Sequence, residues 1–431
     1  MGFSMLSTAP TTTSTTFLYI YCLYIHSLGW VGVYICVAFR YFLILLLFSF
    51  IFLLLYYLLT GDVFMKLECS KKSLLNAINI VSKAVSTRST LPILNCILLT
   101  GDREGFRLLA SDRELSIETD NIESDLYEKG SVAIDAKMFA DIIKALPTEM
   151  VTLTVDEKNV CHIKSGKSEF TINGQPAEQF PEVPVVNKRE NIVLKSADVK
   201  NMIKQTIFSV ATDESKPILT GELFKFDENC FNAVAIDGFR VSWRKTVCEY
   251  DGYTEMVVPS KTLNELARLL SDDENEKATI YYSSSYILFE IKGCTIVSRL
   301  LDGEFLNYEN LFVENSPVKL TANTHELLSA FERATIVSED NKKTPVILTI
   351  KENNLNIRTT TDRGLVNEDV PITLDGEELV ITFNARYIID ILKVVEEEYV
   401  TMNFNTNKSP CIVTGVTNHD YKYLVLPINP R

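Results

Sequence analysis

The sequence predicts an α+β fold made of three tandem, similar domains, each with two helices packed on antiparallel sheets. Short sequence markers recur three times at a spacing of about 125 residues. Each period contains two helix-like patterns set among runs that alternate between polar and apolar residues. The length of 431 residues, 46% hydrophobic and 23% charged, leaves room for three domains of ordinary size.

Residues 1–64 differ from the rest of the chain. Phe17–Leu59 is an apolar, aromatic-rich run broken by Arg40, and the stretches 17–39 and 41–59 are each long enough to span a bilayer. One interpretation is therefore a membrane hairpin. A secretory signal peptide fits poorly, because no basic residue precedes the run and the run is too long.

A third interpretation is that these residues are translated upstream sequence and that the protein starts at Met65. The low-complexity run Thr11–Thr16, the lack of a positive cluster that would fix an orientation, and the abrupt start of the globular pattern at Met65 favour it. We therefore expect a cytoplasmic protein, with a membrane anchor as the alternative.

The nine cysteines support the same compartment. They are odd in number and form no Cys-x-x-Cys pair, which suits free thiols in a reducing cytosol better than a disulfide framework. The formal net charge of −14 argues against holding nucleic acid through bulk charge. It leaves a local basic surface possible.

Three markers define the repeat. The first is a proline-containing passage, seen at Arg88–Leu94, Glu214–Leu219 and Lys343–Leu348, whose prolines are 125 and 128 residues apart. The second is an aspartate, seen as Asp112, Asp237 and Asp362. The third is a basic residue at a helix start, seen as Lys137, Lys261 and Arg386. The predicted domains are 65–186, 187–313 and 314–431.

In the first domain, apolar residues at helical spacing predict two helices. The first helix buries Leu74, Ile78, Val81 and Val85 and presents Lys72, Asn76, Asn79 and Lys83 on another face. The second buries Phe139, Ile142, Ile143 and Leu146 and presents Lys137, Asp141 and Lys144. Predicted strands include Phe106–Ala110, Val151–Val155 and Phe170–Ile172.

The second and third domains repeat this pattern. Their predicted helices are Val199–Val210 with Lys200 and Lys204, Thr262–Leu270 with Arg268, Leu327–Ile336 with Arg333, and Ala385–Val395 with Arg386 and Lys393. Most helices thus present basic residues, whereas acidic runs such as 272–274 and 396–398 fall in loops. A sorted surface of this kind is compatible with a clamp, in which two chains would supply six domains, with helices lining a hole and lysines meeting phosphates, but the helices alone do not favour it. The alternative is the ordinary solvated face of any amphipathic helix.

Enzyme interpretations lack a candidate site. The four histidines are scattered, with no cysteine or carboxylate at ligand spacing, so no metal or cofactor is expected. Ser165–Ser168 resembles the end of a phosphate loop, but Cys161 stands where the first glycine is needed and a strand follows. Asp272–Glu274 is typical of a solvated turn rather than a metal site. An enzyme on a repeated α+β scaffold and a membrane-anchored protein remain the competing classes.

From Met65 to Arg431 the sequence resembles the bacterial DNA polymerase III beta subunit, the replicative sliding clamp. The matching passages are Arg88–Leu94, Asp237–Val241, Leu301–Phe305 and Tyr423–Ile428. The resemblance implies a head-to-tail homodimeric ring around duplex DNA with no catalytic activity of its own. It also implies partners: the replicative polymerase alpha subunit, the clamp loader, repair polymerases and mismatch-repair proteins.

The resemblance also implies residue roles. Arg88 matches a family residue that faces DNA, and Lys137 and Lys261 match basic positions on the inner helices. The polar faces of the predicted helices add Lys72, Lys83, Lys200, Lys204, Arg268, Arg386 and Lys393 as expected DNA-facing residues. A pocket for a partner peptide between domains two and three would contain Met202, Asp237, Gly238, Arg240, Val241, Leu306, Leu424, Val425, Leu426, Pro427 and Ile428. This pocket would anchor leucine and phenylalanine side chains. Residues of the dimer interface would be Phe170, Ile336 and Val337, with core packing as the alternative.

The sequence departs from the family pattern at three places. Phe239 stands where a histidine is often seen, and Leu306 replaces a proline of the pocket. Glu309 and Asn310 stand where the family can carry arginines, which puts DNA contact from that loop in doubt.

Overall fold

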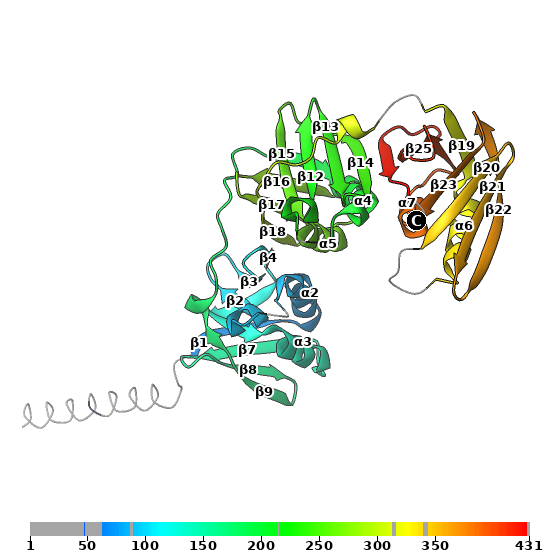
Figure 1. Cartoon of the computed structure of the whole chain (residues 1–431). Coiled ribbons are helices and arrows are strands. Elements are labelled where there is room, and N and C mark those ends of the chain that lie inside the picture. Colours follow the sequence, from blue (N-terminus) through cyan, green and yellow to red (C-terminus); the bar gives the residue numbers. More distant parts are fainter. Residues whose placement is uncertain are drawn as a thin grey trace, which may run out of the picture. The chain divides into compact units, whose positions relative to one another are not determined.

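The computed structural model describes residues 63–86, 89–213, 215–312, 316–338 and 344–428, together with Leu47 (Figure 1). Nearly all of the N-terminal segment discussed above lies outside these ranges, and so does Arg88. No helix within the described ranges is both long and apolar enough to cross a membrane. Residues 65–155 and 159–431 form one compact unit. Within it, the first, second and third repeats denote 65–186, 187–313 and 314–431, the boundaries predicted from the sequence.

The three repeats share one order of elements, in which a strand leads to a helix, then to further strands, a second helix and the last strands. The first repeat contains β1 (Val63–Ser70), α2 (Lys71–Val81), β2 (Cys96–Gly101), β3 (Phe106–Ser111), β4 (Leu115–Thr119), β5 (Ser124–Glu128), β6 (Gly130–Asp135), α3 (Ala136–Ala145), β7 (Met150–Asp156), β8 (Val160–Ser165), β9 (Ser168–Asn173) and β10 (Gln175–Pro176). The second contains β11 (Ile192–Lys195), α4 (Ser196–Thr206), β12 (Gly221–Asp227), β13 (Cys230–Ile236), β14 (Arg240–Val247), β15 (Thr254–Pro259), α5 (Ser260–Leu269), β16 (Lys277–Tyr282), β17 (Tyr286–Ile291) and β18 (Cys294–Arg299). The third contains β19 (Val318–Asn323), α6 (Thr324–Thr335), β20 (Pro345–Lys351), β21 (Asn354–Thr361), β22 (Gly364–Asp375), β23 (Leu379–Asn384), α7 (Ala385–Leu392), β24 (Tyr399–Phe404), β25 (Cys411–Gly415) and β26 (Tyr421–Val425).

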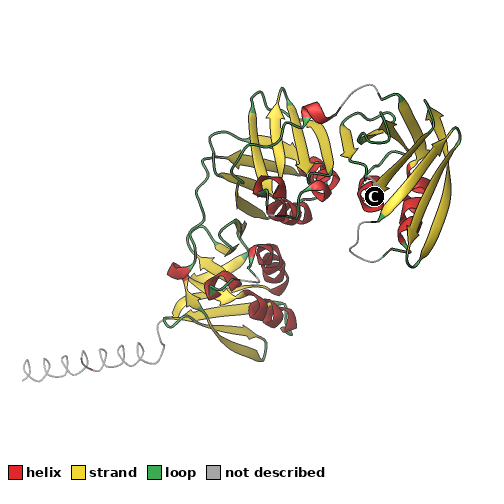
Figure 2. Cartoon of the chain, viewed as in Figure 1, coloured by secondary structure: helices red, strands yellow, loops and turns green. Residues whose placement is uncertain are grey.

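In each repeat the two helices contact one another and pack against strands (Figure 2). The apolar faces predicted from the sequence are buried: Leu74, Ile78 and Val81 of α2 and Phe139 and Ile143 of α3 are all inaccessible to solvent. The prediction of an α+β fold with two helices on antiparallel sheets in each repeat is confirmed. The last predicted residue of the first helix, Val85, lies beyond α2, after a short 3₁₀ turn at Ser82–Ala84.

The sheets continue from one repeat into the next. A nine-stranded sheet has the order β10-β6-β2-β3-β4-β18-β17-β16-β11, so that β4 of the first repeat pairs with β18 of the second. A twelve-stranded sheet joins the second and third repeats through antiparallel pairing of β14 with β26. Main-chain ladders therefore connect all three repeats.

The sequence markers correspond to local structures. Asp112 and Asp237 each accept hydrogen bonds at Oδ1 from the main-chain N–H groups two and three residues later, which closes the β3–β4 and β13–β14 turns. Lys137, Lys261 and Arg386 are each the second residue of a helix. The aspartate marker therefore specifies a turn in the first two repeats, and the basic marker specifies a helix start in all three.

The proline marker behaves differently in the third repeat. Pro92 and Pro217 each begin a 3₁₀ turn, a position that suits a residue with fixed φ and no N–H. Pro345 instead begins strand β20. One sequence marker therefore starts two kinds of local structure.

A buried carboxyl group lies between α4 and β12. Glu222 is fully buried; its Oε1 accepts a 2.5 Å hydrogen bond from Thr206 Oγ1, and its Oε2 has no hydrogen-bond partner. Burial raises the pKa of Glu222 to about 8, against the smaller opposing effect of the hydrogen bond from Thr206. The folded protein therefore holds this proton at neutral pH, where the unfolded chain has lost it.

We expect Glu222→Gln to stabilise the fold increasingly as the pH rises. Between the ordinary pKa of a glutamate and about 8, the unfolded state releases the proton and the folded state keeps it, so wild-type stability falls through that window. The free energy of unfolding of the variant should exceed that of the wild type by roughly 3–5 kcal/mol more at pH 8.5 than at pH 5. Urea denaturation of both proteins at several pH values measures this difference, and parallel pH dependences would contradict it.

Candidate functional site

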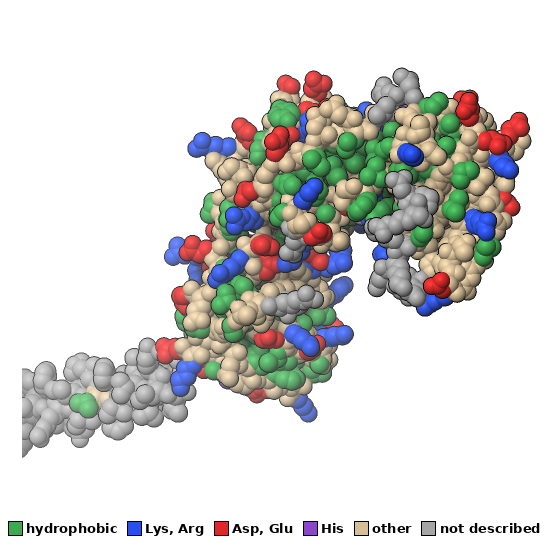
Figure 3. Space-filling model, viewed as in Figure 1, with side chains coloured by type: hydrophobic (Ala, Val, Ile, Leu, Met, Phe, Trp, Pro, Cys, Tyr) green, Lys and Arg blue, Asp and Glu red, His purple; other side chains and the backbone are tan. Residues whose placement is uncertain are grey.

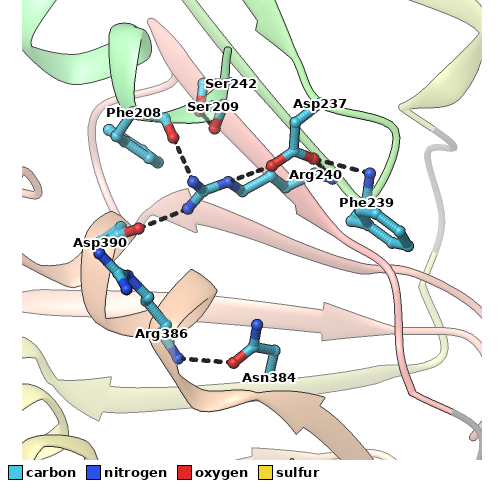
Figure 4. Close-up of polar contacts among 9 residues, drawn as sticks. All are labelled: Phe208, Ser209, Asp237, Phe239, Arg240, Ser242, Asn384, Arg386 and Asp390. Carbon is cyan, nitrogen blue, oxygen red and sulfur yellow. Dashed lines mark hydrogen bonds and ion pairs between the residues drawn. The ribbon is translucent and has the colours of Figure 1, made fainter. Parts of the chain in front are cut away.

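Arg240 connects the second repeat to the third (Figure 4). Its Nε donates to Asp237 Oδ2 at 2.9 Å, its Nη1 donates to Asp390 Oδ2 of α7 at 2.7 Å, and its Nη2 donates to the carbonyl oxygen of Phe208. The guanidinium lies over the rings of Phe208 and Tyr387, with its Cζ 5.3 and 4.6 Å from the ring centroids. Only 11% of the side chain is exposed. The residue is therefore fixed on every side by groups from both repeats.

The turn before Arg240 is shaped by glycine. Gly238 has a φ of +89°, in the left-handed region that residues with a Cβ rarely adopt. The next residue, Phe239, is 49% exposed, and its ring stacks on Tyr387 with centroids 6.4 Å apart. Burial raises the pKa of Tyr387, and the nearby Asp237 carboxylate adds to this. The turn thus presents an aromatic surface shared by two repeats.

Strand β26 lies beside β14 at this point. Val241 pairs with Leu424 and Arg240 with Val425. Beyond the strand, the N–H of Leu426 donates to the carbonyl oxygen of Phe239 at 2.9 Å. The main chain is thereby held against the turn that carries Phe239.

An apolar cluster lies where β14 of the second repeat pairs with β26 of the third. Leu219, Val241 and Leu424 are buried in it together with Leu223, Val234, Ile236, Val257 and Tyr308. Leu306, the residue after Phe305 that packs against the cluster, is 50% exposed, and Leu426, two residues after Leu424, is 38% exposed. Apolar side chains at a solvent boundary, with charged groups of fixed geometry beside them, form a surface suited to anchoring apolar side chains of a peptide.

The structure places the predicted pocket residues on several segments, and two of them are core residues. Asp237, Gly238, Arg240, Val241, Leu306, Leu424, Leu426, Pro427 and Ile428 lie in the β13–β14 turn, in the 300–312 segment or along β26 and its extension. Met202 is 1% exposed in the core beneath α4, and Val425 is fully buried in the core of the third repeat. Both side chains belong to cores, because each lies on the inward face of its element.

The structure adds residues that sequence reasoning missed. Phe208, Tyr387 and Asp390 surround Arg240, yet they come from segments up to 150 residues away. Tyr387 directly follows Arg386 of the third sequence marker, so the repeat pointed to its helix start. Nothing in the sequence alone indicated that this helix start meets the β13–β14 turn.

The departures from the family pattern have identifiable surroundings. Glu309 accepts a 2.8 Å ion pair from Lys225 of β12, which ties the 309–312 segment to the sheet. Phe239 replaces a polar ring with one that stacks on Tyr387. Leu306 is an apolar side chain that is half exposed to solvent.

The predicted DNA-facing residues divide into two groups. Five are in ion pairs: Lys83 with Glu265 at 3.6 Å, Lys200 with Asp272 at 2.8 Å, Arg268 with Glu265 at 2.8 Å, Lys393 with Glu332 at 3.1 Å, and Lys261 with Asp112. Lys72, Lys137, Lys204 and Arg386 are exposed on α2, α3, α4 and α7, and none has an ion-pair partner among the described residues. These four are the cations most available to an external phosphate.

The three predicted dimer-interface residues are not core residues. Phe170 on β9 is 36% exposed, Ile336 after α6 is 75% exposed and Val337 is half-buried. The alternative of simple core packing is therefore wrong for Phe170 and Ile336. Their part in an interface stays a prediction.

Two passages that were set aside above as small-molecule sites lie in a hairpin and in an exposed turn. Ser165–Ser168 spans the β8–β9 hairpin, and the buried Ser165 is hydrogen-bonded to Thr148 and Met150. Asp272 and Asp273 lie in an exposed turn. In the described ranges no three His, Cys, Asp or Glu side chains are grouped so as to hold a metal ion.

Three family models match the chain in order. They describe the N-terminal, central and C-terminal domains of the DNA polymerase III beta subunit and match residues 65–184, 193–307 and 309–429. The beta sliding clamp of Halalkalibacterium halodurans is 34% identical over 357 residues, covering 80% of this chain and 93% of that protein.

Solved structures agree with these matches. The crystal structure of a DNA polymerase III beta subunit from Eubacterium rectale is 38% identical, with a TM-score of 0.82 over 85% of this chain and 99% of that chain. The DNA polymerase sliding clamp of Bacillus subtilis is 31% identical, with a TM-score of 0.82 over 85% of this chain and 100% of that chain. With three repeats of one plan matched domain by domain, this chain belongs to the family of the DNA polymerase III beta subunit, the DNA sliding clamp.

Proposed function

We propose that two copies of this chain close head to tail into a six-domain ring around duplex DNA. The ring tethers the replicative polymerase for processive synthesis. The observation that carries the proposal is the threefold repetition of a helix pair whose outer faces present cations without ion-pair partners among the described residues. Figure 3 shows basic side chains gathered where α2 and α3 lie in Figure 1.

Such cations suit retention on DNA without sequence readout. An unpaired, exposed lysine approaches a phosphate without first breaking an ion pair, and phosphate contacts carry no base information. The acidic remainder of the surface, with a net charge of −14 for the chain, repels DNA elsewhere. Lys72, Lys137, Lys204 and Arg386 would therefore line the hole, and binding would be topological.

Electron microscopy of the full chain tests the assembly. Particles with an open centre and a sixfold outline would support a ring of two chains. Compact particles without a hole, at micromolar concentration, would overturn it.

Replacing Lys72, Lys137 and Lys204 together by alanine should weaken DNA binding and its salt dependence. Each phosphate contact that is lost should lower the slope of log K against log salt concentration by about 0.9. Fluorescence anisotropy with a labelled DNA duplex at several salt concentrations measures this slope. The matched control replaces Lys164, Lys195 and Lys319, which are exposed on strands, and equal slopes for the two triple variants would contradict the assignment.

We also propose that the surface around Arg240, Leu424 and Leu426 docks short peptides of partner proteins. The partners would be the polymerase alpha subunit, the clamp loader, repair polymerases and mismatch-repair proteins. The fixed guanidinium and the apolar cluster beside it support this role. The chain would act in the cytoplasm as a processivity factor for DNA replication and leave the chemistry to the polymerase.

Two open strand edges support the dimer. Strand β9 pairs only with β8 among the described strands, and Gly364–Pro371 of β22 pairs only with β21. Exposed apolar side chains lie at or near these edges. They are Phe170 on β9, Leu365 at the start of β22, and Ile336 just after α6. Pairing β9 of one chain with β22 of the other would cover both edges and bury these side chains.

A further inference from the structure

A second cavity adjoins the groove on the same face of the twelve-stranded sheet. It has a volume of about 350 Å³ and is lined mainly by Trp243, Lys245, Lys422, Lys225, Tyr308 and Phe312. Trp243 and Phe312 pack against the apolar cluster that contains Val241 and Leu424. The cavity is therefore continuous with the floor of the proposed peptide groove.

Strand register explains this continuity. Val241, Trp243 and Lys245 alternate along β14, so their side chains share one face of the sheet. Across the ladder, Leu424 faces Val241 and Lys422 faces Trp243. An apolar row is thus followed by an aromatic and basic row, two residues or roughly 7 Å further along the strands.

The indole of Trp243 is held in one orientation. Its Nε1 donates to Asn232 Oδ1 at 3.1 Å, and Asn232 Nδ2 donates in turn to Asp227 Oδ1 at 3.0 Å. The Phe312 ring lies at 6.4 Å between centroids, tilted by 51°. The cavity wall is therefore built before any ligand arrives.

The charges of the cavity are unevenly distributed. Lys225 is bound by Asp227 at 3.1 Å and by Glu309 at 2.8 Å, which neutralises it. Lys245 and Lys422 lie over the Trp243 ring, with their Nζ atoms 5.9 and 5.8 Å from its centroid. Lys422 has no ion-pair partner within the described part of the chain. Lys245 contacts Asp420 at 3.6 Å in a pair that is half exposed and therefore weak.

These features define the chemistry of an occupant. A carboxylate near the Trp243 ring would meet two ammonium groups, one of them unpaired. Asp227 and Glu309 are already paired with Lys225, and Glu228 also lines the cavity, so the two lysines at the Trp243 ring suit a single carboxylate and not a polyanion such as nucleic acid. The continuity with the groove places the occupant one or two residues from an anchored leucine.

We propose that this cavity extends the partner groove and receives an acidic residue flanking the apolar anchors of a partner peptide. This proposal rests on the peptide-docking role proposed above. The acidic residue would add affinity and would distinguish partners that carry it from partners that do not.

Peptide binding to the full chain tests the extension. The probes are a fluorescein-labelled pentapeptide with leucine and phenylalanine anchors, and the same peptide with Glu-Glu or Gln-Gln added at either end. One of the two Glu-Glu peptides should bind at least fivefold more tightly than its Gln-Gln counterpart. This gain should vanish in the Lys245→Gln/Lys422→Gln variant, while the affinity for the pentapeptide stays within twofold of wild type.

The control variant Lys319→Gln/Lys351→Gln, altered at strand lysines of the third repeat, should keep the gain. Tryptophan fluorescence gives a second measurement, because the chain contains only Trp30 and Trp243. The tight peptide should change the emission of the wild type and leave that of Trp243→Phe unchanged.

The outcomes separate the two proposals. Binding of the pentapeptide with no gain from either Glu-Glu extension would overturn the acidic extension alone. Failure of every peptide to bind would overturn the groove and its extension together. A gain that persists in the Lys245→Gln/Lys422→Gln variant would also overturn the extension.

Discussion

Replacing Arg240 by alanine is expected to destabilise the protein by about 3 kcal/mol and to reduce partner-peptide affinity more than tenfold. The guanidinium pairs with Asp237 and Asp390, whose side chains are only 13% and 27% exposed. Removing it leaves two carboxylates near one another in a partly desolvated joint, with no cation between them.

Two measurements check this result. Urea denaturation reports the free energy of unfolding, and fluorescence anisotropy with the leucine- and phenylalanine-anchored pentapeptide reports affinity. Arg240→Lys should recover little of either, because an ammonium group cannot reach both carboxylates and the Phe208 carbonyl oxygen in the planar geometry of a guanidinium.

Arg299→Ala is the matched control for Arg240→Ala. Arg299 also pairs with an aspartate three residues away, but its contact with Asp302 is 3.8 Å long and the two side chains are 60% and 79% exposed. We expect a change in stability close to zero. Equal effects of the two alanine variants would show that the joint around Arg240 has no special energetic role.

Replacing Phe170 by aspartate is expected to convert the dimer to a monomer. The side chain lies on the open β9 edge and is 36% exposed, so the fold of one chain should tolerate the change. In a dimer, a buried carboxylate without a partner would cost several kcal/mol, which raises the dissociation constant by at least a hundredfold. Mass photometry and sedimentation velocity should detect one chain where the wild type gives two.

Tyr127 provides the control for Phe170. It is 58% exposed on β5, the opposite edge strand of the same five-stranded sheet. Tyr127→Asp should leave the mass and the DNA retention of the dimer unchanged. A Phe170→Asp protein that stays dimeric would place the interface elsewhere.

Local features of the fold could be predicted from the sequence, and the joint between repeats could not. The helix faces around Leu74 and Phe139 follow from periodicity, and the turn at Asp237 depends on hydrogen bonds within three residues. The partners of Arg240 lie in segments that the sequence does not connect. Pairing Asp390 with Arg240 requires the third repeat to be positioned against the second, which the β14–β26 ladder does.

The misplacement of Met202 has a related cause. Its spacing with Val199 and Ile203 already placed it on the apolar face of a helix, and such a face serves the core before it serves a ligand. The family resemblance assigned Met202 to the pocket, but it did not show in which direction the side chain points. By contrast, Leu306 and Leu426 are exposed, and a groove needs accessible apolar groups of this kind.

The ladders between repeats, β4 with β18 and β14 with β26, bear on how such a chain diverges after gene duplication. Main-chain donors and acceptors are the same for every residue except proline, so a joint made from them tolerates drift in its side chains. Copies of one ancestral unit could then lose most of their common sequence and stay connected. Selection would retain similarity only where geometry is demanding, as at the turns of Asp112 and Asp237. One copy would remain free to acquire a specialised surface, such as that around Arg240.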